Sequence, residues 1–479
     1  MAFPRIARFH SAAALREHCA TLAAPIPFDD EPLSAAAGSP LAATASIGGR
    51  TVGNRWCIHP MEGWDATADG RPTEILLRRW GHFGSSGAAL VWGGEAVAVV
   101  HEGRANPNQL VAPACGADGL RLLLDTLRAS HRAAHGDDGD LVVALQLTHS
   151  GRFSRPGPGP RRPVIAGHHP LLDERHGVDP SLPVLDDDGI ERLVDRYVAA
   201  ARLAADAGFD MVDVKACHGY LVHEFLGARR RPGRFGGDLA GRSRLLLELV
   251  GRIRAACPGL LVGVRLSLFD TVPWHRAGDH GAPCPTGAEP YDCGFGVDPT
   301  NPALPDLAEP IELVRLLARA GVVAVNCSAG NPYATPHLLR PAAFPPSDGY
   351  PPPEDPLVGV WRQIEATARV KAAVPTMTLV GSGYTYLQEY LPHAAQAVVR
   401  RGWADLVGLG RMVLSCPEFP ADVLAGRAPA RGRVCRTFSD CTSAPRNGLR
   451  SGCFPLDPFY KALEPDRAAL AAIKAGHGG

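Results

Sequence analysis

Two glycine motifs near the end of the chain contain groups that proteins use to bind phosphate. Gly381 and Gly383 form a Gly-x-Gly, and Gly410 is followed directly by Arg411. Backbone N–H groups in such turns, with an arginine fork beside them, are common phosphate donors. Either motif alone is weak evidence, because simple tight turns also contain glycine. At the ends of two consecutive predicted strands, the motifs together favour a phosphate site.

Other polar side chains also lie at the ends of short apolar runs. Lys215, His218 and Tyr220 follow the run 210–214. Gln146 lies near the end of 141–147, and Arg265 near the end of 261–266. The last two would either contact a bound cofactor or form a buried polar pair that braces the protein interior.

The elements that must position these residues alternate between short β-branched or apolar runs and amphipathic segments of helical length. This alternation is typical of βα units around a parallel sheet. The predicted strands are 56–59, 88–91, 141–147, 210–214, 261–266, 322–326, 376–380 and 405–409. One predicted helix is N-capped by Asp188 and ends at Gly208, and others are predicted at 73–81, 120–131, 242–256, 310–320, 358–372 and 384–401.

Eight strand–helix repeats predict an α/β fold, a (β/α)8 TIM barrel, in which functional residues lie at the carboxyl ends of the strands. A doubly wound sheet is the alternative, but it would need a glycine-rich turn after its first strand. The chain has Pro60-Met61-Glu62-Gly63-Trp64 at that place. We therefore predict an N-terminal extension over 1–48 with a short helix at 12–22, a barrel over 49–430 and a C-terminal extension over 431–479.

Two long loop insertions follow the fifth and sixth strands, at 271–307 and 331–356, and the second contains nine prolines. Structureless loops of this length are commonly lids or binding loops. Decoration specific to one lineage is the alternative.

Composition excludes several other classes of function. Lys+Arg and Asp+Glu balance at 49 each, so no overall field favours nucleic acid or an anionic membrane. No apolar run reaches the ~18 residues of a membrane span, and Arg16, Glu17 and His18 interrupt the segment that a signal peptide would need. We expect a cytoplasmic protein with a small-molecule substrate, no nucleic-acid or membrane partner, and twelve reduced cysteines. Assembly into a homo-oligomer stays open.

Six ordered motifs resemble the old yellow enzyme family of FMN-dependent oxidoreductases, over most of the chain from Gly49 to about Gly426. The longest runs from Phe209-Asp210 through His218-Gly219-Tyr220-Leu221 and Glu224-Phe225-Leu226 to Arg234-Phe235-Gly236-Gly237 and Arg242-x-Arg244. The others are Gly53-Asn54-Arg55 with Pro60-Met61, Leu145-Gln146-Leu147-x-His149-x-Gly151-Arg152, Val264-Arg265-Leu266-Ser267, Gly381-Ser382-Gly383 and Gly408-Leu409-Gly410-Arg411.

The resemblance implies FMN in the barrel mouth. Gln146 would hydrogen-bond the pyrimidine edge, and Arg265 would stabilise the negative charge of the reduced flavin. The residues that would hold FMN are Pro60, Met61, Gly94, Gln146, Arg265, Gly383, Gly410 and Arg411.

The resemblance also implies the catalytic residues. Tyr220 matches the family's tyrosine, which protonates the carbon next to the one that receives hydride. His218 matches the second member of a pair that polarises the substrate carbonyl. The first member is usually histidine or tyrosine, but here it is Lys215. Lys215 would be an ammonium donor to an enolate-like transition state, an anchor for a substrate carboxylate, or an ion-pair partner for an acid such as Asp213 or Glu62.

The first-strand loop also departs from the family pattern. Glu62 and Trp64 occupy positions that often carry Cys, Thr or Tyr, so we expect an unusual substrate pocket. Asn326 and Tyr333, after the sixth strand, are candidates to face the substrate.

The spacing of the cysteines indicates whether the chain could hold an iron–sulfur cluster or a zinc ion. Some relatives carry a four-iron cluster on Cys-x2-Cys-x3-Cys-x11-Cys, but only the last spacing matches here, so we expect no Fe–S cluster. The three cysteines in this region are Cys435, Cys441 and Cys453. A second cysteine- and histidine-containing group lacks the close cysteine pair of a zinc site, so we interpret its members as loop residues. They are His275, His280, Cys284 and Cys293.

The leading hypothesis is an FMN-dependent oxidoreductase that takes hydride from NAD(P)H and reduces an activated alkene of the α,β-unsaturated carbonyl type. A flavin-dependent dehydrogenase or demethylase that oxidises an amine or alcohol is the alternative. A barrel that binds a ligand without turnover is a third, supported only by the unusual residues Lys215 and Glu62.

Overall fold

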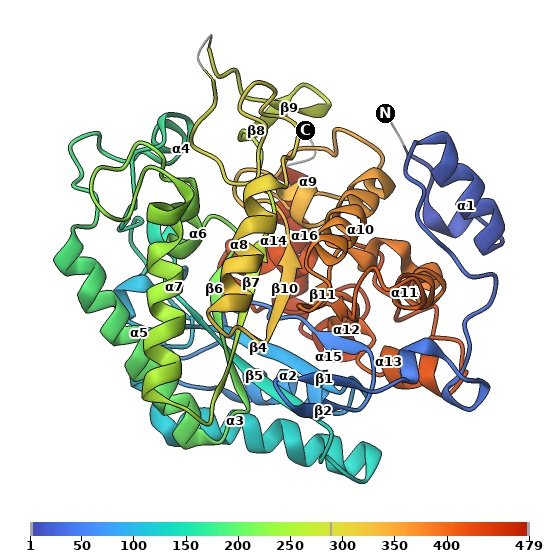
Figure 1. The fold of residues 1–479 in the computed structure, drawn as a ribbon. Helices are drawn as coiled ribbons and strands as arrows, with labels where there is room; N and C mark the ends of the chain where they lie inside the picture. Colours follow the sequence, from blue (N-terminus) through green and yellow to red (C-terminus); the bar gives the residue numbers. More distant parts are fainter. Residues whose placement is uncertain (1–2, 288–289, 477–479) are drawn as a thin grey trace.

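A computed structural model describes residues 3–287 and 290–476 and contains the predicted barrel (Figure 1). Eight parallel strands close in the order β10-β11-β12-β3-β4-β5-β6-β7. They are β3 (Trp56–Ile58), β4 (Leu90–Ala98), β5 (Val142–Thr148), β6 (Met211–Ala216), β7 (Leu261–Ser267), β10 (Ala324–Ser328), β11 (Thr378–Gly381) and β12 (Leu406–Leu409). Each predicted strand is therefore confirmed, with its ends moved by a few residues.

The largest shift is in β4, whose predicted range ended before Gly93 and Gly94. The strand continues to Ala98, with a break in its register between Gly93 and Ala96. Gly93 and Gly94 have φ of 96° and 49°, a region that glycine enters without steric cost. The two glycines thus form a bulge inside the strand and do not end it.

Helices surround the barrel and bury their apolar faces against it. They are α2 (Glu74–Gly84), α3 (Ala112–His135), α5 (Asp187–Ala207), α7 (Leu239–Ala256), α8 (Ala308–Arg319), α10 (Pro356–Ala373) and α11 (Leu391–Arg400). The N-cap of α5 is Asp186, which accepts from Gly189 N at 2.7 Å, and not Asp188 as predicted. The predicted helix 384–401 begins as the 3-10 segment η6 (Tyr384–Tyr390), because Gln388 has a φ of 55°.

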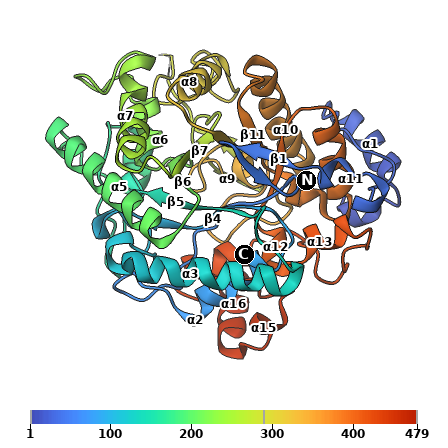
Figure 2. The same cartoon turned by 60° about the horizontal axis from the view of Figure 1, so that its bottom comes forward.

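The N-terminal extension reaches the bottom of the barrel. Its elements are η1 (Ile6–Arg8), α1 (Ala12–Thr21), η2 (Ala35–Ala37), η3 (Pro40–Ala42) and the hairpin β1 (Ala45–Ile47) and β2 (Arg50–Val52). Ile47 and Val52 are fully buried in one cluster with barrel residues such as Trp92 and Met211. Figure 2 shows β1 lying across this end. The hairpin, which straddles the predicted boundary at 48, closes the barrel floor.

The loops at the carboxyl ends of the strands carry the remaining elements. They are η4 (His101–Gly103), η5 (Gly151–Phe153), α4 (Pro170–His176), α6 (Leu221–Gly227), β8 (Trp274–Ala277), β9 (His280–Pro283), α9 (Pro336–Leu339) and α12 (Met412–Ser415). The helix that follows α12, α13 (Phe419–Leu424), lies instead near the amino end of β4, where Ala421 N donates to Ser86 O at 3.1 Å. The insertion 271–307 therefore contains a hairpin, β8–β9, where a structureless loop was expected. The hairpin lies at the top of Figure 1, opposite β1 and β2.

The C-terminal extension packs against the second insertion. It contains α14 (Asp440–Arg446), α15 (Pro458–Lys461) and α16 (Glu464–Gly476). Ser439 Oγ donates to Phe344 O at 2.7 Å, and Ser347 N donates to Ser443 Oγ at 2.9 Å. These contacts hold α14 over the mouth of the barrel.

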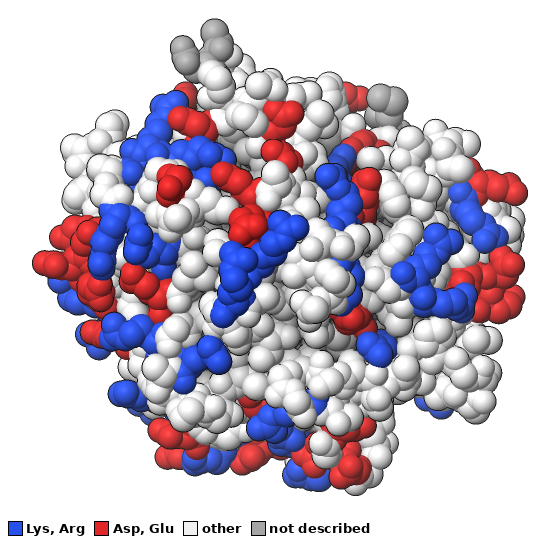
Figure 3. All heavy atoms as spheres, in the orientation of Figure 1, with Lys and Arg blue, Asp and Glu red and all other residues white. Residues whose placement is uncertain are grey.

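The distribution of charge on the surface agrees with the balanced composition. Positive and negative side chains are interspersed on the face drawn in Figure 3. Within residues 3–287 and 290–476, no helix combines the length and the apolar character needed to cross a membrane.

Candidate active site

A cavity of about 230 Å³ lies at the carboxyl ends of the strands. The residues predicted from the sequence that line it are Pro60, Met61, Gln146, Lys215, His218, Tyr220, Arg265, Gly383, Gly410 and Arg411. Gly94 lies outside this lining, but its carbonyl oxygen accepts from Met61 N at 3.0 Å. Residues from seven of the barrel's strand–loop units thus come together only in the folded chain.

One end of the cavity is organised by the buried carboxylate of Asp213. Gln146 Nε2 donates to Asp213 Oδ2, and Arg265 N donates to Asp213 Oδ1, both at 2.6 Å. Burial raises the pKa of Asp213 to about 6, and the hydrogen bond from Gln146 opposes that rise. Because Nε2 of Gln146 is used in this way, its amide oxygen is the group left to accept from a ligand N–H.

Arg265 lies beside this group and has unused donor capacity. Its Nη1 donates to Pro60 O at 3.2 Å, whereas its buried Nε has no hydrogen-bond partner among the described residues. A buried guanidinium nitrogen without a partner is costly and normally has a ligand. These contacts suit the polar edge of a flavin.

The other end of the cavity carries uncompensated positive charge. Arg411 Nη2 donates to Pro341 O at 3.0 Å, but its buried Nη1 has no partner in the described part of the chain, and the same holds for Arg340 Nη2. Burial, together with Arg446 and Arg411, lowers the pKa of Arg340 to about 9. At Gly410 an added Cβ would have only Met61 Sδ near it, at 3.9 Å, so there is room beside the backbone. This donor set fits a phosphate group, and the two ends together fit FMN.

Tyr220 and Lys215 meet at one carboxylate oxygen. Tyr220 Oη donates to Glu62 Oε2 at 2.8 Å, and Lys215 Nζ lies 3.6 Å from the same oxygen. The ammonium nitrogen also lies 3.7 Å from the centre of the Tyr220 ring. Of the three interpretations of Lys215, the ion pair with Glu62 is therefore present, whereas Asp213 accepts from Gln146 and Arg265.

The surroundings set the protonation tendencies of these two residues. Burial, and then Glu62, raise the pKa of Tyr220 well above its usual value. Burial lowers the pKa of Lys215, and Glu62 opposes that effect. Tyr220 is thus a neutral phenol over a wide range of pH, and Lys215 is a stronger acid than a lysine in water.

His218 lies in the cavity as a neutral imidazole. Burial, and then the charge of Arg265, hold its pKa well below 6.5. His218 has a φ of 66°, and its amide N donates to Ser267 Oγ at 3.1 Å. Its Nε2 lies 2.8 Å from Ser328 Oγ. These bonds maintain a backbone conformation that non-glycine residues rarely adopt.

Of the two candidates after the sixth strand, Tyr333 lines the cavity and Asn326 does not. Asn326 is fully buried, and its Nδ2 lies 3.1 Å from His59 Nδ1. His59 Nε2 lies 2.9 Å from Ser382 Oγ. The expectation for Asn326 was wrong because the residue sits inside β10, where it supports the cavity from below.

The C-terminal extension contributes residues to the cavity, and of these only Cys441 was singled out from the sequence, as a cysteine of the incomplete cluster motif. The lining residues from this segment are Cys441, Thr442, Pro445, Arg446, Ser451 and Gly452. Arg340, from the second insertion, was also missed, and its Nη1 donates to Thr442 Oγ1. Trp64 and Glu62 from the first-strand loop line the cavity as well. No local pattern marks the residues of the extension, because only long-range packing brings them here.

Burial raises the pKa of Cys453, and Cys435 and Cys441 raise it further. Cys284 Sγ, in the first insertion, lies 3.6 Å from His275 Nδ1. Among the described residues, no three His, Cys, Asp or Glu side chains are grouped so that they could hold a metal ion.

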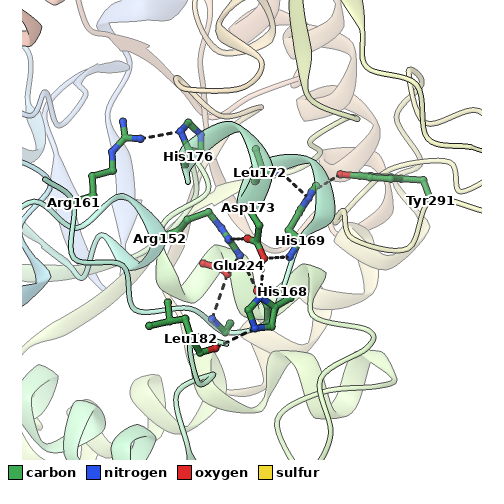
Figure 4. A network of polar contacts seen from close by, with 12 residues as sticks. Arg152, Arg161, His168, His169, Leu172, Asp173, His176, Leu182, Glu224 and Tyr291 are labelled. Carbon is green, nitrogen blue, oxygen red and sulfur yellow. Dashed lines mark hydrogen bonds and ion pairs between the residues drawn. The ribbon is translucent and has the colours of Figure 1, made fainter. Parts of the chain in front are cut away.

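A second cavity, of about 290 Å³, is lined by residues that lie next to His218 and Tyr220 in the chain, among them Gly219, His223 and Glu224. Arg152 donates to Glu224 Oε1 at 2.6 Å and also to Asp173, and His169 Nε2 lies 2.9 Å from Tyr291 Oη (Figure 4). This network ties α4 to α6, the helix that follows Tyr220, and so fixes the start of that helix.

Comparison with known proteins supports the same assignment of fold and cofactor. The sequence profile of the NADH:flavin oxidoreductase / NADH oxidase family matches residues 46–278. An NADPH dehydrogenase of Halalkalibacterium halodurans is 26% identical over 381 residues, which cover 78% of this chain and 91% of the relative.

Solved structures show the same fold at low sequence identity. The old yellow enzyme homologue from Zymomonas mobilis superposes with a TM-score of 0.56 and 21% identity, over 81% of this chain and 94% of that one. Histamine dehydrogenase from Rhizobium sp. 4-9 has a TM-score of 0.65 and 20% identity, over 88% of this chain and 52% of that one. The chain therefore spans nearly the full length of the first structure but only about half of the second.

Proposed function

Because the chain belongs to the NADH:flavin oxidoreductase / NADH oxidase family, which includes the old yellow enzymes, we propose that it reduces activated alkenes of the α,β-unsaturated carbonyl type. It is an FMN-dependent oxidoreductase with NAD(P)H as its electron donor. The observation that carries the proposal is the presence of Tyr220 and His218 in one cavity with Gln146 and Arg265.

When bound and reduced by NAD(P)H, FMN would supply the hydride for the β-carbon of the alkene. His218, a neutral imidazole, donates an N–H to the substrate carbonyl and so withdraws electrons from the alkene. Tyr220 gives its hydroxyl proton to the α-carbon. Gln146 and Arg265 would hold the polar edge of the cofactor, and Arg340 with Arg411 would neutralise its phosphate.

Tyr220→Phe tests the proton-donor role. The variant loses the hydroxyl but keeps the ring, so we expect reoxidation of the reduced enzyme by 2-cyclohexenone to slow by about 100-fold. Reduction of the enzyme by NADPH needs no carbon protonation and should change far less. Stopped-flow absorbance of the flavin measures both half-reactions.

The matched control is Tyr390→Phe, which removes a hydroxyl that donates to Phe9 O at 2.7 Å, outside the cavity lining. Equal alkene turnover in wild type and Tyr220→Phe would exclude Tyr220 as the donor. Bleaching of the flavin by an amine or alcohol, without NAD(P)H, would favour the dehydrogenase alternative.

We further propose a location in the cytoplasm and a small-molecule substrate. The balanced charge, 49 basic against 49 acidic residues, supports a partner other than nucleic acid. Size-exclusion chromatography with light scattering would decide between a monomer and a homo-oligomer.

A further inference from the structure

We propose that Lys215 is the proton reservoir of the reaction and that Glu62 passes its proton to Tyr220. This inference rests on the proposed alkene reduction and assigns roles to two of the residues that depart from the family pattern. Lys215 and Glu62 act on the substrate only through Tyr220.

The proposal rests on one carboxylate oxygen of Glu62 that both Tyr220 and Lys215 approach. Glu62 Oε2 accepts the Tyr220 hydroxyl at 2.8 Å, and Lys215 Nζ lies 3.6 Å away from the same atom. The flexible lysine stem can shorten the second distance by a small rotation. The side chains of Lys215 and Glu62 are only 5% and 15% exposed, so the exchange is shielded from bulk water.

The second contact concerns the ring of Tyr220. Lys215 Nζ lies over this ring, 3.7 Å from its centre. A cation there stabilises the phenolate that Tyr220 becomes after it has protonated the substrate. Lys215 is thus positioned both to stabilise the deprotonated tyrosine and to restore its proton.

Other polar and titratable groups face this set from the neighbouring elements. Asn106 Nδ2 lies 3.4 Å from Glu62 Oε1, and Tyr333 Oη lies 3.4 Å from Tyr220 Oη. The groups that influence the charge of Lys215 are Glu62, Cys217, Arg265 and Asp213. Arg265 repels a proton on Lys215, and the two acids attract it. Burial outweighs the attraction of these acids, so Lys215 is easier to deprotonate than a lysine in water.

The proton transfers balance in three steps. First, the Tyr220 O–H bond breaks and the α-carbon C–H bond forms, which leaves a phenolate. Second, a Lys215 N–H bond breaks, the proton reaches Glu62 Oε2 and moves on to Tyr220 Oη. Third, the neutral amine of Lys215 takes a proton from water after the product has left the cavity.

The variant Lys215→Arg distinguishes the supply of a proton by Lys215 from the effect of its positive charge. Arginine keeps the positive charge and the ion pair with Glu62, but it does not release a proton at accessible pH. We expect alkene turnover of the FMN-loaded enzyme to fall at least about tenfold. The matched control is Lys474→Arg, which changes an exposed lysine that pairs with the buried Asp440 at 2.8 Å outside the cavity lining and should not change turnover.

The relay predicts the direction in which alkene turnover changes with pH. The reservoir works only while Lys215 is protonated, so wild-type turnover should fall as pH rises through the pKa of Lys215, which burial places below 10.5. In Lys215→Arg this fall in turnover with rising pH should be absent. Full turnover in Lys215→Arg, with the same pH profile, would overturn the relay while leaving alkene reduction in place. A wild-type enzyme that turns over no alkene would instead overturn the proposed function.

A spectroscopic measurement tests the coupling without any turnover. The chain has four lysines, Lys215, Lys371, Lys461 and Lys474, so 13C-labelling of lysine side chains gives four signals that NMR can titrate. Lys215→Met assigns the signal of interest. In Glu62→Gln the loss of the carboxylate should shift the Lys215 midpoint to lower pH and leave the other three in place. An unchanged midpoint would overturn the coupling between Glu62 and Lys215.

Discussion

At the residue scale, the positive end of the cavity has more donors than the family motif alone indicates. Arg411 belongs to a Gly-Arg motif, whereas Arg340 lies in the second insertion and has no motif around it. Both have a buried guanidinium nitrogen without a partner among the residues described. We infer that Arg340 is a second arginine for the FMN phosphate.

Arg340→Ala should weaken the binding of FMN and leave the binding of riboflavin, which lacks the phosphate, nearly unchanged. A charge-assisted hydrogen bond contributes about 1.5–3 kcal/mol, so the dissociation constant for FMN should rise by roughly tenfold or more. Quenching of flavin fluorescence on titration with the apoprotein measures both constants. Arg315→Ala, on the exposed face of α8, is the control. An equal loss of riboflavin binding would point to a general disturbance of the pocket.

At the element scale, one buried arginine joins helix α2, strand β4 and the C-terminal extension. Arg79 on α2 forms ion pairs with Asp65 and Glu95, and its Nη2 donates to Ser451 O at 2.9 Å. Burial raises the pKa of Glu95 to about 7, and the charge of Arg79 opposes this rise. The extension is therefore held to the barrel by a charge cluster in the interior.

Arg79→Met should destabilise the protein by about 3–5 kcal/mol, because it leaves buried carboxylates without their cation. Its loss also raises the pKa of Glu95 further. A raised acid pKa means that the folded state keeps a proton that the unfolded state releases, so stability falls as pH rises through that range. The loss should thus be larger at pH 8 than at pH 6, as measured by guanidinium denaturation.

The matched variant is Arg71→Met, which removes an exposed ion pair with Asp69 at 2.9 Å and should cost less than about 1 kcal/mol at either pH. An equal loss at pH 6 and pH 8 in Arg79→Met would contradict the role assigned to Glu95.

At the scale of the whole molecule, the two ends of the chain close the two ends of the barrel. The hairpin β1–β2 packs Ile47 and Val52 into the barrel floor, and α14 lies over the mouth. We therefore expect the stability of the barrel floor and the binding of ligands at the barrel mouth to be independent of each other.

Ile47→Ala should lower the free energy of unfolding by about 2–5 kcal/mol, the usual cost of truncating a fully buried isoleucine. Ser46→Ala changes an exposed residue of the same strand and should have little effect. Urea denaturation compares the two. A marked loss of FMN affinity in folded Ile47→Ala would show that floor and mouth are coupled.

Local sequence patterns were sufficient to predict the barrel. Each βα unit repeats the same alternation of apolar run and amphipathic helix, so all eight strands could be located from the sequence. The errors lie where conformation depends on a few residues. Asp186 and not Asp188 caps α5, and the glycines of β4 form a bulge that a periodicity argument cannot distinguish from a strand end.

The sequence by itself determined the architecture, the family resemblance and the residues at the strand ends, because periodicity and motifs are properties of short segments. Only the tertiary structure decided what those residues contact. It placed Glu62 between Lys215 and Tyr220, buried Asn326 beneath His59, and brought Arg340 and the C-terminal extension into the cavity. The physical reason is that ion pairs and shared hydrogen bonds depend on distances across the barrel mouth, and segments far apart in the chain set those distances.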